Sequence, residues 1–411
     1  MEKPQPTLRR SLSLNLVTFY GLGNILGAGI YVLVGKVAGE AGYLAPVSFL
    51  VASLIAGLTA FTYAELASRF PVSAGETVYV FEGFGRKQLS ILVGLLIIMT
   101  GVVSAATIAR GFVGYLNVFL SVPGWLAIIL MLSALGAVAI WGIMESVRTA
   151  AVLTALEVFG LLLLLFVTAP YFTELPARVD QFTPTLELAV WPGIFSGAFL
   201  AFYAFVGFED MVNVAEEVKN PQRNLPRGIL LALAVSTVLY VAVAFAVLLV
   251  LPPEQLAGSD APLANVYQEV TGNMPLVISF IAMFAVINGA LIQIIMASRV
   301  CYGMARQRWL PAILCRVSSL TRTPIVATVL VTLLVIVMAL WLPIEQLARV
   351  TSFCLLIIFC LVNLSLWRIK SRDEEVEAGI FQVAKWIPVA GFVAAACLLA
   401  AEIAGRLFGI G

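Results

Sequence analysis

Histidine is absent from the 411-residue sequence. This absence excludes histidine metal sites, histidine-based catalysis and a histidine proton relay, so proton coupling has to use a carboxylate, a tyrosine or a lysine. The five cysteines show no CxxC spacing, and most lie within or beside apolar segments. We therefore expect small buried hydrophobic residues at these positions, and no disulfide, metal or cofactor.

Charge is also scarce in this chain. Charged residues make up 11% of it, whereas about 25% is usual in a soluble domain. Hydrophobic residues make up 61%, and the mean hydropathy is +1.03. The net charge of +1 does not indicate a nucleic-acid partner. The composition predicts an integral membrane protein surrounded by a lipid bilayer.

Long apolar runs are what the sequence has in abundance. A helix needs about 20 apolar residues to cross a bilayer. Eleven spans are predicted: Leu12–Val34, Tyr43–Ala67, Leu89–Leu120, Trp125–Gly142, Thr149–Tyr171, Val190–Glu216, Gly228–Leu251, Met274–Arg299, Pro324–Leu342, Gln346–Trp367 and Ile387–Phe408. No cleavage-site pattern precedes the first run, so we expect it to be retained as a helix.

Lysine and arginine are unevenly distributed between the two sides of these spans. With a cytoplasmic N-terminus, most of the 24 fall in cytoplasmic segments. The outer segments hold Lys36, Arg178, Arg349 and Arg406, and Arg110 lies inside a span. This positive-inside bias predicts a multi-pass protein of the cell (inner or plasma) membrane with its N-terminus in the cytoplasm.

The spans divide into two sets of five, with one span left over. Because five is odd, the second set begins on the opposite side of the membrane, which is the arrangement of an inverted repeat. We predict a cytoplasmic leader over residues 1–11, a first five-helix repeat over 12–171 and a second over 190–367. Residues 368–411 would form a cytoplasmic loop and a peripheral eleventh helix.

The first span of each set is interrupted. Gly27-Ala28-Gly29 breaks the first, and Ala204–Gly207 breaks the second, just before Glu209 and Asp210. An unpaired backbone group in hydrocarbon costs several kcal/mol, so irregular backbone persists at that depth only where it lines a cavity. Two matching breaks predict the substrate site of a transporter.

Several motifs, in this order, resemble the amino acid–polyamine–organocation (APC) superfamily. They are N-I-L-G-A-G-I-Y-V (Asn24–Val32), Y-A-E-L-A-S-R-F-P-V-S-A-G-E-T-V-Y-V (Tyr63–Val80), A-F-V-G-F-E-D (Ala204–Asp210) with A-E-E-V-K-N-P-Q-R-N-L-P (Ala215–Pro226), and S-R-V-C-Y-G-M-A-R-Q-R-W-L-P (Ser298–Pro311). The resemblance implies an all-α membrane fold with a 5+5 inverted repeat and broken helices 1 and 6. This chain has about 11 transmembrane helices where the family usually has twelve.

The resemblance also places an amino acid or amine between the two breaks. Backbone N–H groups at the first break suit a carboxylate, and carbonyls at the second suit an ammonium group. Tyr203 aligns with an aromatic residue that closes over substrate in relatives, and Phe208 is a second gate candidate. Helix packing and ordinary aromatic core remain the alternatives. The candidate substrate-binding residues are Ile25, Gly27, Ala28, Gly29, Ile30, Tyr203, Ala204, Phe205, Val206, Gly207 and Phe208.

Two carboxyl groups are candidates for coupling or gating. Glu157 lies eight residues into the fifth span, where an ionised carboxyl is expensive and a function is the default hypothesis. Its position matches one where some relatives carry a lysine that replaces a sodium ion, so that lysine mechanism is not available here. Glu209 begins the segment after the second break, where the family often has an acid linked to gating or proton sensing. A structural cap is the alternative for Glu209, and a partner for a nearby polar group is the alternative for Glu157.

We predict a secondary active transporter of amino acids or related amines that works by alternating access, is coupled to protons and is not an enzyme. An exchanger and a non-transporting sensor remain alternatives. A channel would need rings of charged groups or carbonyl-rich loops, and an enzyme would need a convergent nucleophile, base or metal site; the sequence has neither pattern. Apolar Ile25, Ile30 and Val206 favour a neutral or hydrophobic substrate.

Overall fold

The structure, a computed structural model, describes residues 12–72, 75–141, 147–318, 321, 323–372 and 378–408. Within these residues the secondary structure is helical apart from an isolated β-bridge between Leu12 and Val218. The predicted all-α fold is therefore confirmed, whereas the leader over residues 1–11 lies outside the described residues.

The predicted spans of the first set correspond to consecutive helices. These are α1 (Leu14–Ile25) with α2 (Ala28–Ala41), α3 (Ala45–Arg69), α5 (Lys87–Leu116), α6 (Gly124–Trp141) and α7 (Val147–Thr168). The 3₁₀ helix η1 (Gly42–Leu44) joins α2 directly to α3. The second span thus begins as a continuation of the first, across a sharp turn at Gly42, whose φ of +59° favours glycine.

The second set and the leftover span follow the same order. They are α9 (Trp191–Phe202) with the 3₁₀ helices η3 (Tyr203–Phe205) and η4 (Glu209–Glu217), then α10 (Pro221–Val250), α13 (Leu276–Arg306), α14 (Ile325–Trp341), α15 (Ile344–Lys370) and α16 (Trp386–Phe408). Among the described residues, nine helical stretches are long and apolar enough to cross a membrane, and α14 is a shorter apolar helix.

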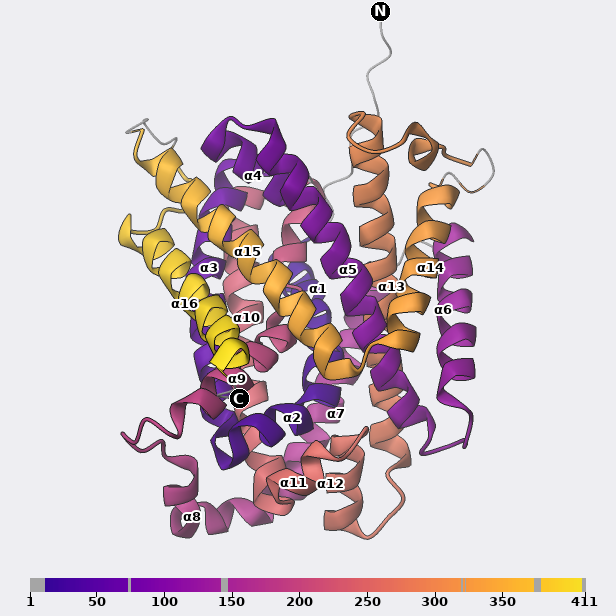
Figure 1. Ribbon diagram of the computed structural model, residues 1–411, viewed down its shortest axis with the longest axis vertical. Helices are drawn as coiled ribbons and strands as arrows, with labels where there is room; N and C mark the ends of the chain where they lie inside the picture. The colour runs from indigo at the N-terminus through magenta and orange to yellow at the C-terminus, as the bar shows by residue number, and fades with distance from the viewer. Residues whose placement is uncertain are drawn as a thin grey trace, which may run out of the picture.

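Short helices cap the two ends of the bundle (Figure 1). One end, where α1 begins, carries α4 (Gly75–Phe84) and η5 (Ala312–Cys315) and is called the N-terminal face below. The other end, called the opposite face, carries η2 (Ala169–Glu174), α8 (Leu175–Phe182), α11 (Pro253–Ala257) and α12 (Pro262–Thr271). The long helices run between these two faces, as membrane spans require.

Helix α16 packs on α3, α9 and α15, and its C-terminal half is held by an ion pair. Near the opposite face, Arg349 on α15 donates to Glu402 on α16 at 2.9 Å and to Glu40 on α2 at 2.5 Å. In mid-helix, Gly391 lies so close to Asn363 that a Cβ would come within 2.6 Å of the Asn363 amide oxygen. The small residue therefore allows α16 to approach α15 closely.

Candidate functional site

The first break falls at Leu26-Gly27, between α1 and α2. Leu26 still donates to Leu22 at 2.8 Å, and α2 then restarts at Ala28 with Gly27 as its N-cap residue. A Cβ built on Gly27 would meet no atom within 4 Å, so this glycine borders open space. The predicted interruption is present, but its irregular residues are Leu26 and Gly27, whereas Ala28 and Gly29, predicted as part of the break, already belong to α2.

The second break spans Val206 to Phe208. Gly207 has a φ of +123°, and a Cβ on it would lie 2.5 Å from the Asn24 carbonyl oxygen of α1. Only glycine combines this backbone conformation with so close an approach. The chain then continues as the 3₁₀ helix η4, which begins at Glu209. The second half of the interrupted span is therefore a 3₁₀ helix and not the α-helix that was expected.

The two breaks contact each other directly. A Cβ on Gly29 would overlap the backbone of Ala204, so the two helices approach to backbone contact there. The Tyr240 hydroxyl of α10 bridges both breaks, donating toward the Ile25 carbonyl at 2.5 Å and the Ala204 carbonyl at 2.9 Å. Carbonyls freed by the breaks are thus partly satisfied by a fully buried tyrosine.

A small cavity of about 20 Å³ lies between the breaks and is called the central cavity below. This volume suits about one water molecule. Its walls come from α1, α2, α5, η3 and α13 and the turn after η3. The lining residues are Asn24, Ile25, Gly27, Gly29, Ser104, Ile108, Tyr203, Val206, Gly289, Ile292 and Gln293.

Five of the sequence candidates line this cavity: Ile25, Gly27, Gly29, Tyr203 and Val206. The others lie around it. Ile30, Ala204 and Phe205 are buried in the helix contacts, and Phe205 packs on Tyr240 with ring centroids 5.2 Å apart. Ala28 is the first residue of α2, and Gly207 contacts Asn24.

Two polar atoms of the central cavity have no hydrogen-bond partner among the described residues. They are the buried Asn24 Nδ2, a donor, and Gln293 Oε1, an acceptor. Buried polar atoms are rarely left without a partner, so each suits a polar ligand. Tyr203 and Ser104 lie on another wall, with their hydroxyl oxygens 3.1 Å apart.

Sequence reasoning did not single out Asn24, Ile108, Gly289 or Ile292. It left Ser104 undecided between pocket and packing, and it interpreted Gln293 as a polar contact between helices. The signal in the sequence was weak, because α5 and α13 are apolar throughout. Which side of such a helix faces the breaks depends on how the helices pack. Ser104 lines the central cavity, whereas Thr100, one turn earlier on α5, does not and donates to the Leu96 carbonyl of its own helix.

Glu157 lies buried on α7 and is not among the residues that line the central cavity. Its backbone carbonyl accepts a 2.6 Å hydrogen bond from the Tyr31 hydroxyl of α2. Glu157 therefore lies where α7 contacts the first broken helix. Its coupling role stays a prediction.

Acidic side chains gather beneath the second break, toward the N-terminal face. Glu209 Oε2 accepts the Gly207 N–H at 2.9 Å, and Asp210 accepts the Gln293 amide at 3.2 Å. Glu76 on α4, which sequence reasoning did not single out, accepts from the Tyr63 hydroxyl at 3.4 Å. Burial, with a contribution from the Asp210 charge, raises the pKa of Glu76 from 4.5 to about 8.

Aromatic side chains separate the central cavity from the N-terminal face. Phe208 packs on Tyr63 and Phe359, with ring centroids 5.6 and 5.3 Å apart. Phe202 extends the cluster through Phe359 at 5.6 Å. The arrangement fits both interpretations of Phe208. The side chain is buried among aromatic rings, as a core residue would be, and it lies between the central cavity and the N-terminal face, as a gate would.

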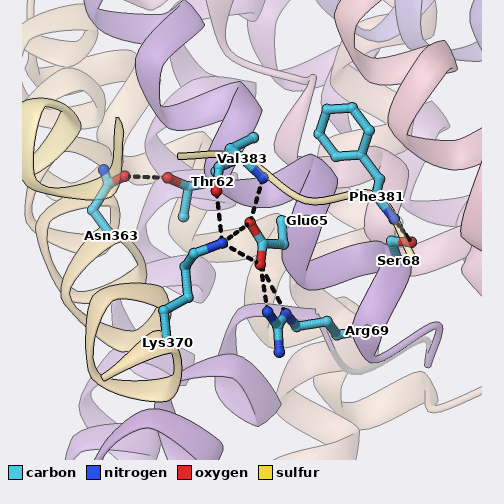
Figure 2. Close-up of polar contacts among 8 residues, drawn as sticks. All are labelled: Thr62, Glu65, Ser68, Arg69, Asn363, Lys370, Phe381 and Val383. Carbon is cyan, nitrogen blue, oxygen red and sulfur yellow. Dashed lines mark hydrogen bonds and ion pairs between the residues drawn. The ribbon is translucent and has the colours of Figure 1, made fainter. Parts of the chain in front are cut away.

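An ion network closes the N-terminal face beyond these rings (Figure 2). Glu65 on α3 is fully buried and accepts from Arg69 at 2.6 Å, from Lys370 of α15 at 2.8 Å and from the Val383 N–H at 2.8 Å. The sequence predicts the Glu65–Arg69 pair as a helix-surface pair. The pair is present, but Glu65 is in the interior, because α15 and the segment before α16 cover it.

A sequence model of the amino acid permease family matches residues 12–405. The branched-chain amino acid permease BcaP of Bacillus subtilis (strain 168) is 29% identical over 396 residues, covering 90% of this chain and 83% of that protein. A methylthioribose transporter of the same organism is 28% identical over 419 residues, covering 96% and 88%.

A plant relative adds a third type of named substrate. The vacuolar cationic amino acid transporter 2 of Arabidopsis thaliana is 32% identical over 389 residues, covering 87% of this chain and 59% of the plant protein. The family match extends over both breaks and both sets of spans, and these relatives are named as transporters or permeases. The chain therefore belongs to the amino acid permease family of the APC superfamily.

Proposed function

We propose that this protein is a secondary active transporter that moves amino acids across the membrane by alternating access, with the central cavity as the substrate site. The observation that carries the proposal is the convergence of two helix breaks on one cavity, whose walls hold an unpartnered donor, Asn24 Nδ2, and an unpartnered acceptor, Gln293 Oε1. Both atoms suit the polar head group of an α-amino acid.

The chemistry of the cavity favours a neutral aliphatic substrate. The carboxylate would bind at Gly27 and Gly29, where α2 begins, and at the Asn24 amide. The ammonium group would face the carbonyls of the second break and Gln293 Oε1. None of the described residues that line the cavity is acidic; the apolar ones are Ile25, Ile108, Val206 and Ile292. Among the relatives, the name of the B. subtilis branched-chain permease fits this substrate class.

Substrate binding requires the broken helices to separate, because a cavity of about 20 Å³ cannot hold an amino acid. The closed state is held on the N-terminal side by the Phe208 cluster and the Glu65 network. We assign the N-terminal face to the cytoplasm from its lysines and arginines, among them Arg69, Arg306 and Lys370. Release to the cytoplasm then needs both barriers to part.

The transport cycle is proposed to take up a proton with the substrate. Glu157, beside the first broken helix, and Glu209, hydrogen-bonded to the second break, are the proposed coupling and gating carboxyls. Both are buried at 4% exposure or less, so ionisation is unfavourable and the charge state can follow the movement of the helices.

Uptake into proteoliposomes tests the proposal. Labelled leucine, isoleucine, valine, lysine and arginine are offered under an inward proton gradient, an inward sodium gradient or no gradient. We expect accumulation of the neutral aliphatic amino acids driven by protons alone, and loss of that accumulation in Glu157→Gln with substrate binding retained. Flux that requires substrate on both sides would indicate an exchanger. Binding without flux under every gradient would indicate a sensor and contradict the proposal.

A further inference from the structure

A second, larger cavity opens at the opposite face and is called the vestibule below. Its volume is about 300 Å³, and its walls come from α2, α5, α6, the turn between α11 and α12, and the turn between α14 and α15. Pockets of about 300 Å³ and above hold small organic ligands. The charged residues on its walls are Lys36, Arg110, Asp260 and Glu345.

The vestibule lies one helical turn beyond the central cavity. Gly29 and Ile108 line the central cavity, whereas Val32 and Gly111, three residues further along α2 and α5, line the vestibule. The two sites are separated there by a tight contact, since a Cβ on Gly111 would overlap the Val32 side chain. A ligand in the vestibule therefore sits directly on the route to the central cavity.

Two of the four charges neutralise each other. Lys36 Nζ lies 3.2 Å from Glu345 and also donates to the Ala257 carbonyl at 2.8 Å. Arg110 and Asp260 have no such counterpart, because none of the ion pairs among the described residues includes either of them. The Arg110 guanidinium donates through Nη2 to the Leu340 carbonyl at 3.1 Å, and its buried Nε has no partner among the described residues.

The two residues that carry these unpaired charges both lie along α5. Asp260 lies against Gly114, one turn of α5 beyond Arg110, which corresponds to about 6 Å along the axis. A guanidinium is a strong partner for a carboxylate, and a carboxylate is a partner for an ammonium group. A cation and an anion that line one cavity and form no ion pair among the described residues therefore match a ligand that carries both charges.

From this geometry we propose that the vestibule is a second binding site, which holds an α-amino acid as its zwitterion before the amino acid enters the central cavity. Arg110 binds the carboxylate and Asp260 the ammonium group. The side chain of the ligand remains in the open part of the vestibule. The site therefore recognises only the α-carboxylate and α-ammonium groups and accepts many different amino acids. This inference depends on the proposed transport function and on assignment of the opposite face to the outside.

Kinetics from the two sides of the membrane test the site. Uptake of labelled leucine by right-side-out vesicles is compared with efflux from preloaded vesicles for wild type, Arg110→Gln, Arg110→Lys and Asp260→Asn. Arg178→Gln and Asp180→Asn, on α8 at the same face but outside the vestibule, are the controls. We expect the uptake KM to rise roughly tenfold in Arg110→Gln and Asp260→Asn, as for loss of one charge-assisted hydrogen bond. Arg110→Lys should recover part of the loss, and the efflux KM should not change.

A carboxylate-free probe makes the test specific. Leucinamide has the ammonium group but no carboxylate, so it should inhibit leucine uptake less well than unlabelled leucine does. The ratio of the two inhibition constants should be smaller in Arg110→Gln than in wild type, because the vestibule no longer selects for the carboxylate while the central cavity still does. Equal changes in uptake and efflux KM, or no change in uptake KM, would overturn the inference. If replacing chloride by gluconate lowers wild-type uptake to the Arg110→Gln level, Arg110 binds an inorganic anion instead, which also overturns it.

Failure of the underlying function has a different signature. Wild type would then show neither uptake nor efflux with any labelled amino acid. The vestibule would in that case be measured by equilibrium binding of labelled leucine, in which Arg110→Gln should still lower the affinity while Arg178→Gln should not. Equal binding by both variants would contradict the site independently of transport.

Discussion

At the residue scale, Ser68 satisfies a backbone group that a proline leaves without its helical partner. Pro226 lies inside α10 and has no N–H, so the Gln222 carbonyl four residues earlier lacks its usual donor. The Ser68 hydroxyl of α3 donates to that carbonyl at 2.8 Å. The same hydroxyl accepts the Phe381 N–H at 2.9 Å (Figure 2). One side chain thus joins α3, α10 and the segment before α16.

Replacing Ser68 with alanine should destabilise the fold by about 1–2 kcal/mol, because two partly buried hydrogen bonds to backbone groups are lost. Thermal unfolding in detergent measures the change. Ser298→Ala is the matched control: this buried serine donates only to Ile295 of its own helix, so its loss should cost less than about 1 kcal/mol. Equal melting shifts for the two variants would contradict the bridging role of Ser68.

A second residue-scale prediction concerns Glu76, which lies on α4 outside the apolar spans. Its pKa is raised to about 8 by burial among Tyr63, Tyr79, Glu209 and Asp210. The unfolded chain ionises near 4.5, whereas the folded protein holds this proton until about 8. Stability is therefore fully present below about pH 4.5 and falls as the pH rises toward 8.

Glu76→Gln should remove this contribution to the pH dependence. Melting temperatures of wild type and variant, measured at about pH 5, 7 and 9, should diverge as pH rises, with the variant losing less stability. Glu82→Gln, at a partly exposed position on the same helix, is the control and should follow wild type. A constant difference between wild type and Glu76→Gln would show that Glu76 does not titrate in this range.

At the element scale, the Glu65 network fastens α15 and the segment before α16 to the end of α3. Lys370 Nζ contacts both carboxylate oxygens of Glu65 at 2.8 Å and donates to the Val383 carbonyl at 2.7 Å. Both side chains are almost inaccessible, with 7% of Lys370 and 0% of Glu65 exposed. Removing one partner of a buried pair costs about 3–5 kcal/mol, since the other charge stays buried.

Lys370→Met should therefore destabilise the protein strongly, and adding Glu65→Gln should recover part of the loss. The four-variant cycle, measured by thermal or denaturant unfolding, yields the coupling energy. Lys219→Met, which removes an exposed lysine at the same face, controls for loss of charge. Additive effects of Lys370→Met and Glu65→Gln would mean that Arg69 and the Val383 N–H are sufficient for the Glu65 carboxylate.

At the scale of the whole molecule, the two faces of the bundle have different charge and different openness. The N-terminal face carries most of the described lysines and arginines and is closed by aromatic rings and ion pairs. The opposite face has the vestibule. If the N-terminal face is cytoplasmic, the vestibule opens toward the outside of the cell in this conformation.

Cysteine labelling tests this orientation. In a background without the five native cysteines, Glu187→Cys on the opposite face should react with a membrane-impermeant maleimide in intact cells. Gln307→Cys, after α13 on the N-terminal face, should react only after permeabilisation. Both positions are exposed in the structure, so access to the reagent decides the result. The reverse pattern would invert the assigned topology and place the vestibule at the cytoplasmic side.

The sequence by itself determined the membrane class, the order of the spans and the position of both breaks. These follow from local properties: apolar length, charge bias along the chain, and small residues such as Gly27 and Gly207 where the backbone departs from a helix. The amino acid permease family was also recognisable, because its motifs are continuous in sequence.

Only the tertiary structure decided which side chains meet. Asn24, Ile108 and Gln293 face the central cavity, and Glu76 joins the acids beneath the second break, because of how uniformly apolar helices rotate and cross. Arg110 and Asp260, far apart in the chain, line one vestibule for the same reason. In a helix that is apolar on all sides, hydropathy does not indicate which side faces the interior. That orientation is determined by helix packing and by the pairing of buried polar atoms.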